Sequence, residues 1–186
     1  MTTVQMTNGV NTEALFGALD AVKAQPAAAK FQFRASNEWI SGTHSRSTIY
    51  DFFGLGAEQT HVESRSYEAD HPLQLVATDK APTPVEFLLH ALAACITAGI
   101  GNIAAARGIE LKRVESTVRG DIDLAGLLGV DLTVRNGYQS IEMEVTIEGD
   151  ASDDELRAVV ERSIARSAVY DMLTNGTSVA VGIAEG

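Results

Sequence analysis

The sequence predicts an α+β fold, in which antiparallel strands come before and after one long apolar helix. Residues 84–107 are apolar for most of their length and carry helix signals at both ends. Several other segments alternate polar and apolar residues, as strands with one buried face do. The expected order is strands, the long helix, more strands, a second helix and a last strand, which is the order of an α+β domain.

Length and charge limit the possible classes of protein. The 186 residues suffice for one domain with an extension, and we divide them into an N-terminal helical extension (1–30) and a main domain (31–186). The 25 acidic and 14 basic residues give a net charge of −11, which argues against nucleic acid or anionic membranes as partners. A single cysteine excludes an internal disulfide framework and fits a reducing cytosol. No secretory signal is visible at the start, so we expect a cytoplasmic protein.

The extension is expected to form one short helix. Asn11 or Thr12 can cap it, the helix runs to about Ala24, and Pro26 ends it. Apolar residues on one side make it an amphipathic packing arm, and nothing in it suggests chemistry.

The first strands follow this helix. From Phe31 the period changes to two, and the stretch SNEWISGTHSRSTIYDF predicts a hairpin with its turn near Ser41 and Gly42. Residues 60–69 predict a further strand, and a loop then leads into the long helix.

The long helix has clear end signals. Pro84 suits a first helical turn and Glu86 places a carboxylate at its positive end, whereas Arg107 and Gly108 favour a stop. One predicted stripe is rich in small residues: Leu88, Ala91, Leu92, Cys95, Ala98, Gly99 and Asn102. The opposite side carries Phe87, Ile96, Ile100 and Ile103.

A helix that is apolar on every side is either buried centrally or spans a membrane. Polar residues interrupt this one at His90, Thr97 and Asn102, and the chain has no second such segment. We therefore expect a buried central helix in a soluble protein. One thin sheet cannot cover all its sides, so we infer that a second subunit does, and we expect an obligate dimer.

Strands and helices then alternate to the end of the chain. Residues 109–124 and 138–148 predict strands, and the second has Ile141, Met143, Val145 and Ile147 on one face. Ser152 and Glu155 form a capping box that starts the second helix. A brief helical turn at 168–173 and a last strand at 178–183 complete the prediction.

Few residues suggest chemistry by themselves. Cys95 lies among Ala and Ile, and a lone cysteine in such surroundings is usually a small inert side chain unless a cation and solvent reach it. The four histidines, His44, His61, His71 and His90, show no metal-ligand spacing with this cysteine. We therefore expect no metal and no cofactor.

The stretch PTPVEFLLHALAACITAG resembles the central-helix signature of the OsmC/Ohr family, the osmotically inducible and organic-hydroperoxide-resistance proteins. In that signature a Pro–x–Glu lead-in precedes Leu and Ala residues and a peroxidatic cysteine. The resemblance extends over residues 31–183. It implies an intertwined homodimer in which antiparallel sheets wrap the two central helices. It also implies thiol-based reduction of hydroperoxides at the dimer interface.

The resemblance assigns roles residue by residue. Cys95 matches the peroxidatic cysteine, and Glu86 resembles the family's carboxylate, which can lie one position earlier. Glu86 is roughly 13 Å along the helix axis from Cys95, so the two cannot touch within one straight helix. Arg46 resembles the hairpin arginine that lowers the thiol pKa, the alternative being a solvated arginine at the hairpin tip.

One departure from the family pattern affects the expected activity. The peroxidases carry a resolving cysteine on the second helix, where this chain has Ser167. A serine cannot form the disulfide that resolves a sulfenate, so the two-cysteine cycle cannot run within this chain.

Three functions remain open. The first is a one-cysteine peroxidase that reduces a small lipophilic hydroperoxide and is regenerated by an external thiol. The second is a non-catalytic protein that binds a small hydrophobic ligand on the same scaffold. The third is a purely structural dimer. The thiol pKa of Cys95 together with hydroperoxide consumption distinguishes the first from the others.

Overall fold

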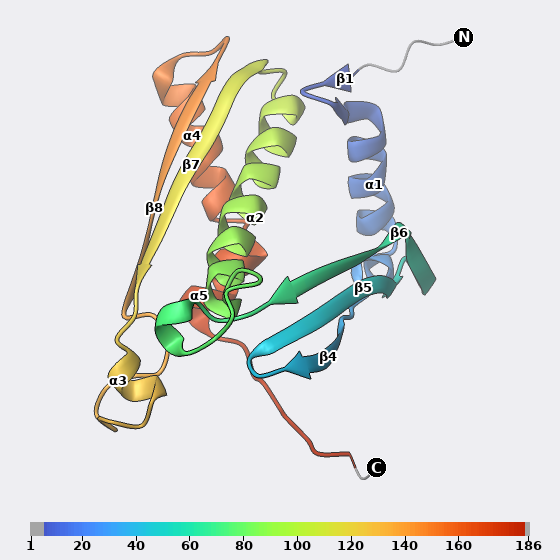
Figure 1. Ribbon diagram of the computed structural model, residues 1–186. Helices are drawn as coiled ribbons and strands as arrows, with labels where there is room; N and C mark the ends of the chain where they lie inside the picture. Colours follow the sequence, from blue (N-terminus) through green and yellow to red (C-terminus); the bar gives the residue numbers. More distant parts are fainter. Residues whose placement is uncertain (1–5, 185–186) are drawn as a thin grey trace. The chain divides into compact units, whose positions relative to one another are not determined.

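The computed structural model describes residues 6–184 and contains both helices and antiparallel sheet (Figure 1). Its contacts divide the chain into two compact units. The first consists of Asn11–Leu88 together with Met6, and the second of residues 7–10 and those from Leu89 onward. The predicted division at residue 30 stays a prediction.

The chain enters the first unit through a short helix. The ladder of β1 (Met6–Thr7) and β2 (Val10–Asn11) leads into α1 (Thr12–Ala24) and a 3-10 turn (Pro26–Ala29). The Asn11 side chain accepts a hydrogen bond from the Ala14 N–H at 2.9 Å, so the predicted cap is confirmed. None of the residues of α1 is buried, so its apolar side stays open within the described chain.

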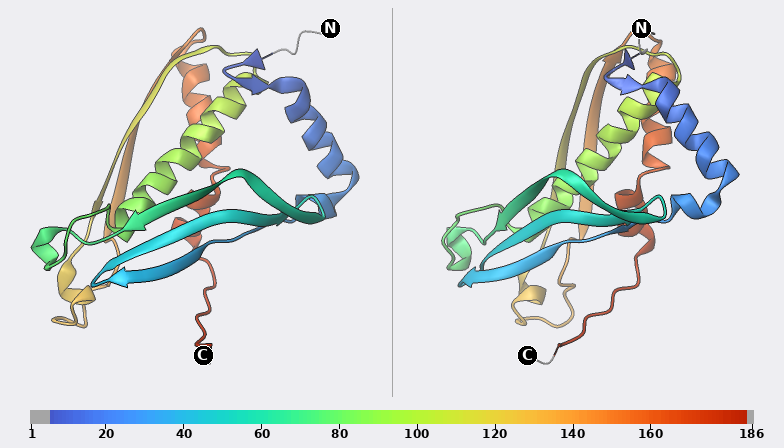
Figure 2. Two further views of the ribbon diagram at one scale, coloured as in Figure 1. Left: turned by 45° about the vertical axis from the view of Figure 1, so that its right-hand side comes forward. Right: turned by 90° about the vertical axis from the view of Figure 1, so that its right-hand side faces the viewer.

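The first unit is built on a four-stranded antiparallel sheet. It contains β3 (Gln32–Phe33), β4 (Ser36–Ser41), β5 (His44–Gly54) and β6 (Ala57–Ala69). The strand β5 pairs with all three others, and Figure 2 shows it with β6 as a long twisted ribbon. The predicted hairpin forms, with its turn one residue later than expected, at Gly42 and Thr43. Gly42 has φ +55°, a left-handed conformation that favours glycine.

A buried carboxylate holds the loop between β6 and α2. Asp70 is 1% exposed. It accepts hydrogen bonds from the hydroxyls of Thr43 and Thr78, each at 2.6 Å, and from the backbone N–H groups of His71 and Lys80. The bonds from the two threonine hydroxyls contribute most, and together the four bonds hold the pKa of Asp70 well below its usual range. The Asp70 side chain thereby ties the hairpin turn to the loop that enters the long helix.

The second unit packs two helices on a hairpin. It contains most of α2 (Pro84–Ala106), then β7 (Leu111–Asp121), β8 (Ser140–Gly149) and α4 (Asp153–Ile164). Figures 1 and 2 show α2 and α4 side by side on one face of β7 and β8. The core comprises Leu92, Ile96, Ile100 and Ala104 of α2, Ile109, and Leu156 and Val159 of α4. The predicted inner face of β8 packs against this core, as expected.

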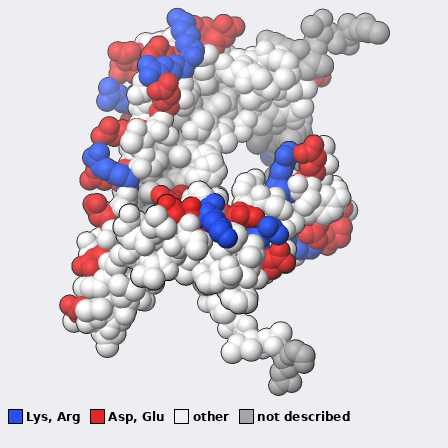
Figure 3. Space-filling view, in the orientation of Figure 1, with Lys and Arg blue, Asp and Glu red and all other residues white. Residues whose placement is uncertain are grey.

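The opposite face of the β7–β8 hairpin is charged. Arg113 pairs with Glu148, and Arg119 pairs with Glu142 across the two strands. Figure 3 shows charged side chains of both signs along the side of the molecule where β7 and β8 lie. The hairpin therefore has one apolar face and one solvated face, as its period-two pattern predicts.

The prediction that α2 is buried on every side is not met within the described chain. The buried stripe is Leu92, Ile96, Ile100 and Ala104. In the stripe rich in small residues, Gly99 packs closely against Ser163, as the prediction of close contact there requires, whereas Ala98 and Asn102 are exposed. Within the described chain α2 is thus buried on one face only. By length and composition alone it could cross a membrane, but core helices of soluble proteins pass the same test.

The C-terminal part has one confirmed helix signal and three differences from the prediction. The capping box of Ser152 and Glu155 is present, with the Ser152 N–H donating to Glu155 at 3.0 Å. The connector contains a short helix, α3 (Leu124–Leu127), and the predicted brief turn is a two-turn helix, α5 (Ala168–Asn175).

The predicted strand at 178–183 is not formed. Its alternating residues Val179, Val181 and Ile183 are 80%, 92% and 100% exposed. A strand needs a sheet edge for its backbone N–H and C=O groups, and the described chain pairs no edge with this segment.

Candidate functional site

Cys95 lies half-buried on α2, beside the start of α5. The helix α5 begins after Ser167, whose Oγ accepts a hydrogen bond from the Tyr170 N–H at 3.2 Å and so acts as its N-cap. The groups at the start of α5 that act on the Cys95 thiol are the Ser167 side chain and the backbone N–H groups of Val169 and Ala168. The sulfur therefore lies at the positive end of a helix, where a negative charge is stabilised.

Two opposed influences act on this thiol. Burial is the largest single one and raises the pKa of Cys95. The hydrogen bonds from Ser167, Val169 and Ala168 together outweigh it, and the pKa lies below its ordinary value. A lower pKa increases the thiolate fraction near neutral pH, and the thiolate is the nucleophilic form of cysteine.

The packing of α4 on α2 positions these donors. The Ser163 hydroxyl donates to the Ile96 carbonyl at 2.6 Å, one residue after Cys95. A Cβ at Gly99 would overlap Ser163 Oγ, so glycine is what allows this close contact. Because Ser163 is only four residues before Ser167, the contact that anchors α4 also places the start of α5.

Arg46 lies in the first unit and is paired with two carboxylates. It lies near the start of β5, opposite Glu38 on β4 and Glu68 on β6. Its guanidinium contacts Glu68 at 2.8 Å and Glu38 at 3.3 Å, and the hydrogen bond to Glu68 chiefly raises its pKa. Arg46 therefore forms inter-strand ion pairs close to the hairpin turn. Its role towards Cys95 stays a prediction.

Glu86 caps the N-terminus of α2. Its carboxylate accepts a hydrogen bond from the Thr83 N–H at 2.8 Å, while the Thr83 carbonyl accepts from the Glu86 N–H at 2.9 Å. This reciprocal pairing satisfies backbone groups at the helix start. A catalytic role for Glu86 stays a prediction.

His44 is buried next to the Arg46 ion pair. It is 6% exposed, and its Nε2 lies 3.0 Å from Glu68, whereas its Nδ1 has no partner within the described chain. His90 is exposed on α2. Among residues 6–184 no three His, Cys, Asp or Glu side chains are grouped closely enough to hold a metal ion.

Several hollows lie on the sheet of the first unit, and two of them are lined in part by apolar side chains. One of about 350 Å³ adjoins the first turn of α2, at Pro84 and Phe87. Its other lining residues are Ala35, Asn37, Ser45, Ser47, Ile49, Tyr67 and Ala69. Along β5, Ser45, Ser47 and Ile49 alternate with Arg46, so Arg46 belongs to the other face of the sheet.

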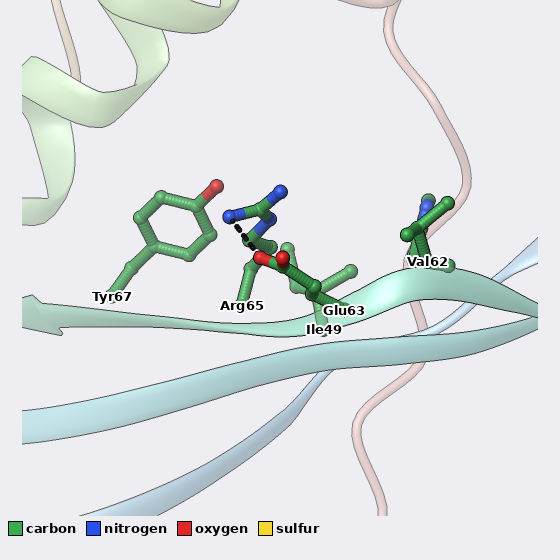
Figure 4. A pocket seen from close by; sticks show the side chains of 6 residues that line it. Ile49, Val62, Glu63, Arg65 and Tyr67 are labelled. Atoms are coloured by element: carbon green, nitrogen blue, oxygen red, sulfur yellow. Dashed lines mark ion pairs between the residues drawn. The ribbon is translucent and has the colours of Figure 1, made fainter.

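The second hollow, of about 310 Å³, lies on β6 (Figure 4). Its one cation, Arg65, is paired with Glu63 at 2.9 Å. The Glu63 carboxylate neutralises the positive charge of Arg65, so the hollow offers no free cation to bind an anion.

The family follows from a sequence comparison. The family described as OsmC-like protein matches residues 77–182, which is more than half of the chain and includes Cys95 and Ser167. The chain belongs to the OsmC-like family. No curated protein matches it in sequence.

Solved structures of OsmC-like proteins share the fold. The OsmC-like protein of Mycoplasma pneumoniae has a TM-score of 0.56 at 17% identity, covering 76% of this chain and 86% of its own. The organic hydroperoxide resistance protein OsmC of Legionella pneumophila has 0.54 at 15% identity, covering 77% and 91%. An OsmC-like protein of unknown function from Vibrio cholerae has 0.55 at 10% identity, covering 77% and 94%. The predicted family and the predicted mixture of helices and sheet are thus confirmed.

The sequence analysis did not identify the backbone donors beside Cys95. The backbone N–H groups of Ala168 and Val169 carry no side-chain signature, and 168–173 was expected to form only a brief turn. Ser167 followed by Asp171 is nevertheless typical of a helix N-terminus, where a capping hydroxyl precedes an acidic first turn. That signal predicts a helix start at Ser167 and hence free N–H groups beside it.

Proposed function

We propose that this OsmC-like protein is a one-cysteine thiol peroxidase that reduces organic hydroperoxides with electrons from an external thiol. The observation that carries the proposal is the set of three hydrogen-bond donors on the Cys95 sulfur, which lowers its pKa despite burial. An inert core cysteine would have its pKa raised by its surroundings.

The chemistry uses the thiolate as nucleophile. The Cys95 sulfur attacks one oxygen of the O–O bond, an S–O bond forms, and the alkoxide leaves and takes up a proton to give the alcohol. The sulfur loses two electrons and becomes a sulfenate, and the hydroperoxide is reduced. The donors of Ser167 and α5 remain placed to stabilise negative charge on the sulfur or on the new oxygen.

Regeneration needs thiols from outside the chain. Cys95 is its only cysteine, and Ser167 stands at the resolving position. An external thiol attacks the sulfenate sulfur, releases water and leaves a mixed disulfide. A second thiol then displaces Cys95 as thiolate and becomes the partner in the new disulfide.

The active form is proposed to be an intertwined homodimer. Two features support this. The small-residue stripe of α2 is apolar yet exposed at Leu88 and Ala98, and segment 178–183 has the alternation of a strand without a sheet edge. A second copy can cover both, and strand exchange between identical chains is a low-cost way to do so.

Ligand binding is a second candidate function. It is favoured by the hollow of about 350 Å³ near Pro84 and Phe87, whose lining is mostly apolar with a few polar groups. In this alternative a small hydrophobic molecule is bound without reaction, and Cys95 is an unreactive side chain that only fills space.

Turnover of cumene hydroperoxide in the presence of a dithiol tests the proposal. The wild-type chain should consume hydroperoxide catalytically, whereas Cys95→Ser should not exceed the rate of the dithiol alone. Equal rates for the two proteins would reject the peroxidase and leave the binding function.

A further inference from the structure

The hollow beside Pro84 and Phe87 is formed by elements of the first compact unit alone. Its volume of about 350 Å³ lies at the low end of the range for ligand pockets, about 300–1,000 Å³. The strand register places Asn37, Ser47 and Tyr67 in one row across β4, β5 and β6, and the first turn of α2 lies beside this row. The hollow therefore has room for a small ligand.

The polar groups on its floor have hydrogen-bonding capacity left over. The Asn37 Nδ2 donates to Ser47 Oγ at 2.9 Å and to Ser45 Oγ at 3.3 Å. A hydroxyl carries one hydrogen and two lone pairs, so each serine can still donate. Among residues 6–184 the two hydroxyls and the Asn37 carbonyl oxygen make no other hydrogen bond. A ligand atom on this floor thus meets two donors and one acceptor.

The hollow offers no charge among the described residues that line it. Arg46 belongs to the other face of the sheet, where it is paired with Glu38 and Glu68. Arg65 lines the neighbouring hollow and is paired with Glu63. An anion bound here would lose its hydration without gaining a counter-charge. The lining therefore favours an uncharged ligand.

We propose that this hollow binds a small, neutral, lipophilic alcohol. Its hydroxyl oxygen accepts hydrogen bonds from Ser45 and Ser47, and its hydroxyl hydrogen is donated to the carbonyl oxygen of Asn37. Its apolar body lies against Ile49 and Phe87. The proposal names the ligand class of the binding function described above, and it does not depend on the peroxidase reaction.

Calorimetric titration of the full chain at neutral pH tests the ligand class, with 1-octanol, octyl methyl ether and octanoate as probes. We expect 1-octanol to bind most tightly. The ether lacks the hydroxyl hydrogen and should bind about three- to tenfold more weakly. Octanoate should bind at least about tenfold more weakly than 1-octanol, because its charge has no partner. Cys95→Ser is titrated in parallel and should bind like the wild type.

Substitutions on the floor separate the two kinds of hydrogen bond. Asn37→Ala removes the acceptor and should reduce the preference for 1-octanol over the ether to about one. Ser47→Ala removes one donor and should weaken both ligands about three- to tenfold. Ser45→Ala should weaken both in the same way, and it replaces either variant that folds poorly.

Ser66→Ala is the matched control. Ser66 precedes Tyr67 on β6, so its side chain belongs to the other face of the sheet, and the substitution should leave both affinities unchanged.

Four results would overturn the proposal. These are no binding of 1-octanol to the wild type, octanoate binding as tightly as 1-octanol, an unchanged preference in Asn37→Ala, or an equal loss of affinity in Ser66→Ala and Ser47→Ala. Hydroperoxide consumption by the wild type is measured separately. Binding of 1-octanol without consumption would reject the peroxidase but keep this site, and consumption without binding would do the reverse.

Discussion

Gly99 is the residue on which the contact between α2 and α4 depends. A Cβ there overlaps Ser163 Oγ, and Ser163 is fully buried and bonded to the Ile96 carbonyl. We expect Gly99→Ala to lower the free energy of unfolding by about 1–3 kcal/mol, as overpacking usually does, and Gly99→Leu to cost more. Urea denaturation measures both.

Gly101 provides the matched control. A Cβ at Gly101 meets nothing within 4 Å. Gly101→Ala should therefore be neutral or stabilise α2 by up to about 1 kcal/mol, because alanine is the better helix former. Equal effects at the two glycines would contradict the close packing of α2 on Ser163.

The buried Asp70 carboxylate makes the free energy of unfolding depend on pH. Its folded-state pKa is depressed, chiefly by the hydroxyls of Thr43 and Thr78. The stabilisation is therefore complete above the unfolded pKa of about 3.9 and is lost as the pH falls through the folded pKa. Asp70→Asn should be less stable than wild type at neutral pH, and the difference should shrink below about pH 4.

Thermal melts of both proteins between about pH 2 and 7 check this dependence. Other carboxylates with lowered pKa, such as Glu58 and Glu68, act equally in both proteins and cancel in the difference. A stability difference that stays constant down to the lowest pH would show that the Asp70 charge is not what holds the loop.

At this scale the sequence identified the candidate thiol but not its surroundings. Cys95 and Ser167 were identified through the family signature, and in the structure the Ser167 side chain is one of the groups that act on the Cys95 thiol. Their chemical roles stay predictions. The donors of Ala168 and Val169 belong to the backbone, and the inter-strand pairing of Arg46 depends on a register that the sequence does not specify.

The positions of the helices and strands were predicted better than which side of each is buried. End signals such as Pro84, the Ser152 capping box and the Asn11 cap act locally, so the sequence alone reveals them. The buried side of α2 could not be predicted, because that helix is apolar all round and its pattern does not distinguish one side from another. Which side is covered depends on long-range packing against β7, β8 and α4.

Segment 178–183 should become a strand only when a second chain supplies an edge. Its alternating Val179, Val181 and Ile183 are exposed in the single chain. Hydrogen exchange should accordingly show these amides protected at high protein concentration and unprotected on dilution to monomer. Fast exchange at every concentration would mean that the segment joins no sheet.

At the scale of the whole molecule, the exposed apolar side of α2 favours an obligate dimer. Sedimentation at micromolar concentration should give the mass of two chains. We expect Ala98→Arg to shift the protein towards monomer or aggregate, because a charged side chain is placed on the proposed contact face. Thr117→Arg adds the same charge on the exposed face of β7 and should leave the mass unchanged. A stable, folded wild-type monomer would contradict the dimer.

The most direct test of the account is the mass of the intact chain after one equivalent of cumene hydroperoxide, measured without added thiol. We expect the mass of one added oxygen atom, located on Cys95, with no disulfide, because Ser167 cannot resolve the sulfenate. Added dithiol should return the original mass. An unmodified Cys95 in the native chain that is readily alkylated after unfolding would identify a buried inert thiol, and would contradict the proposed peroxidase.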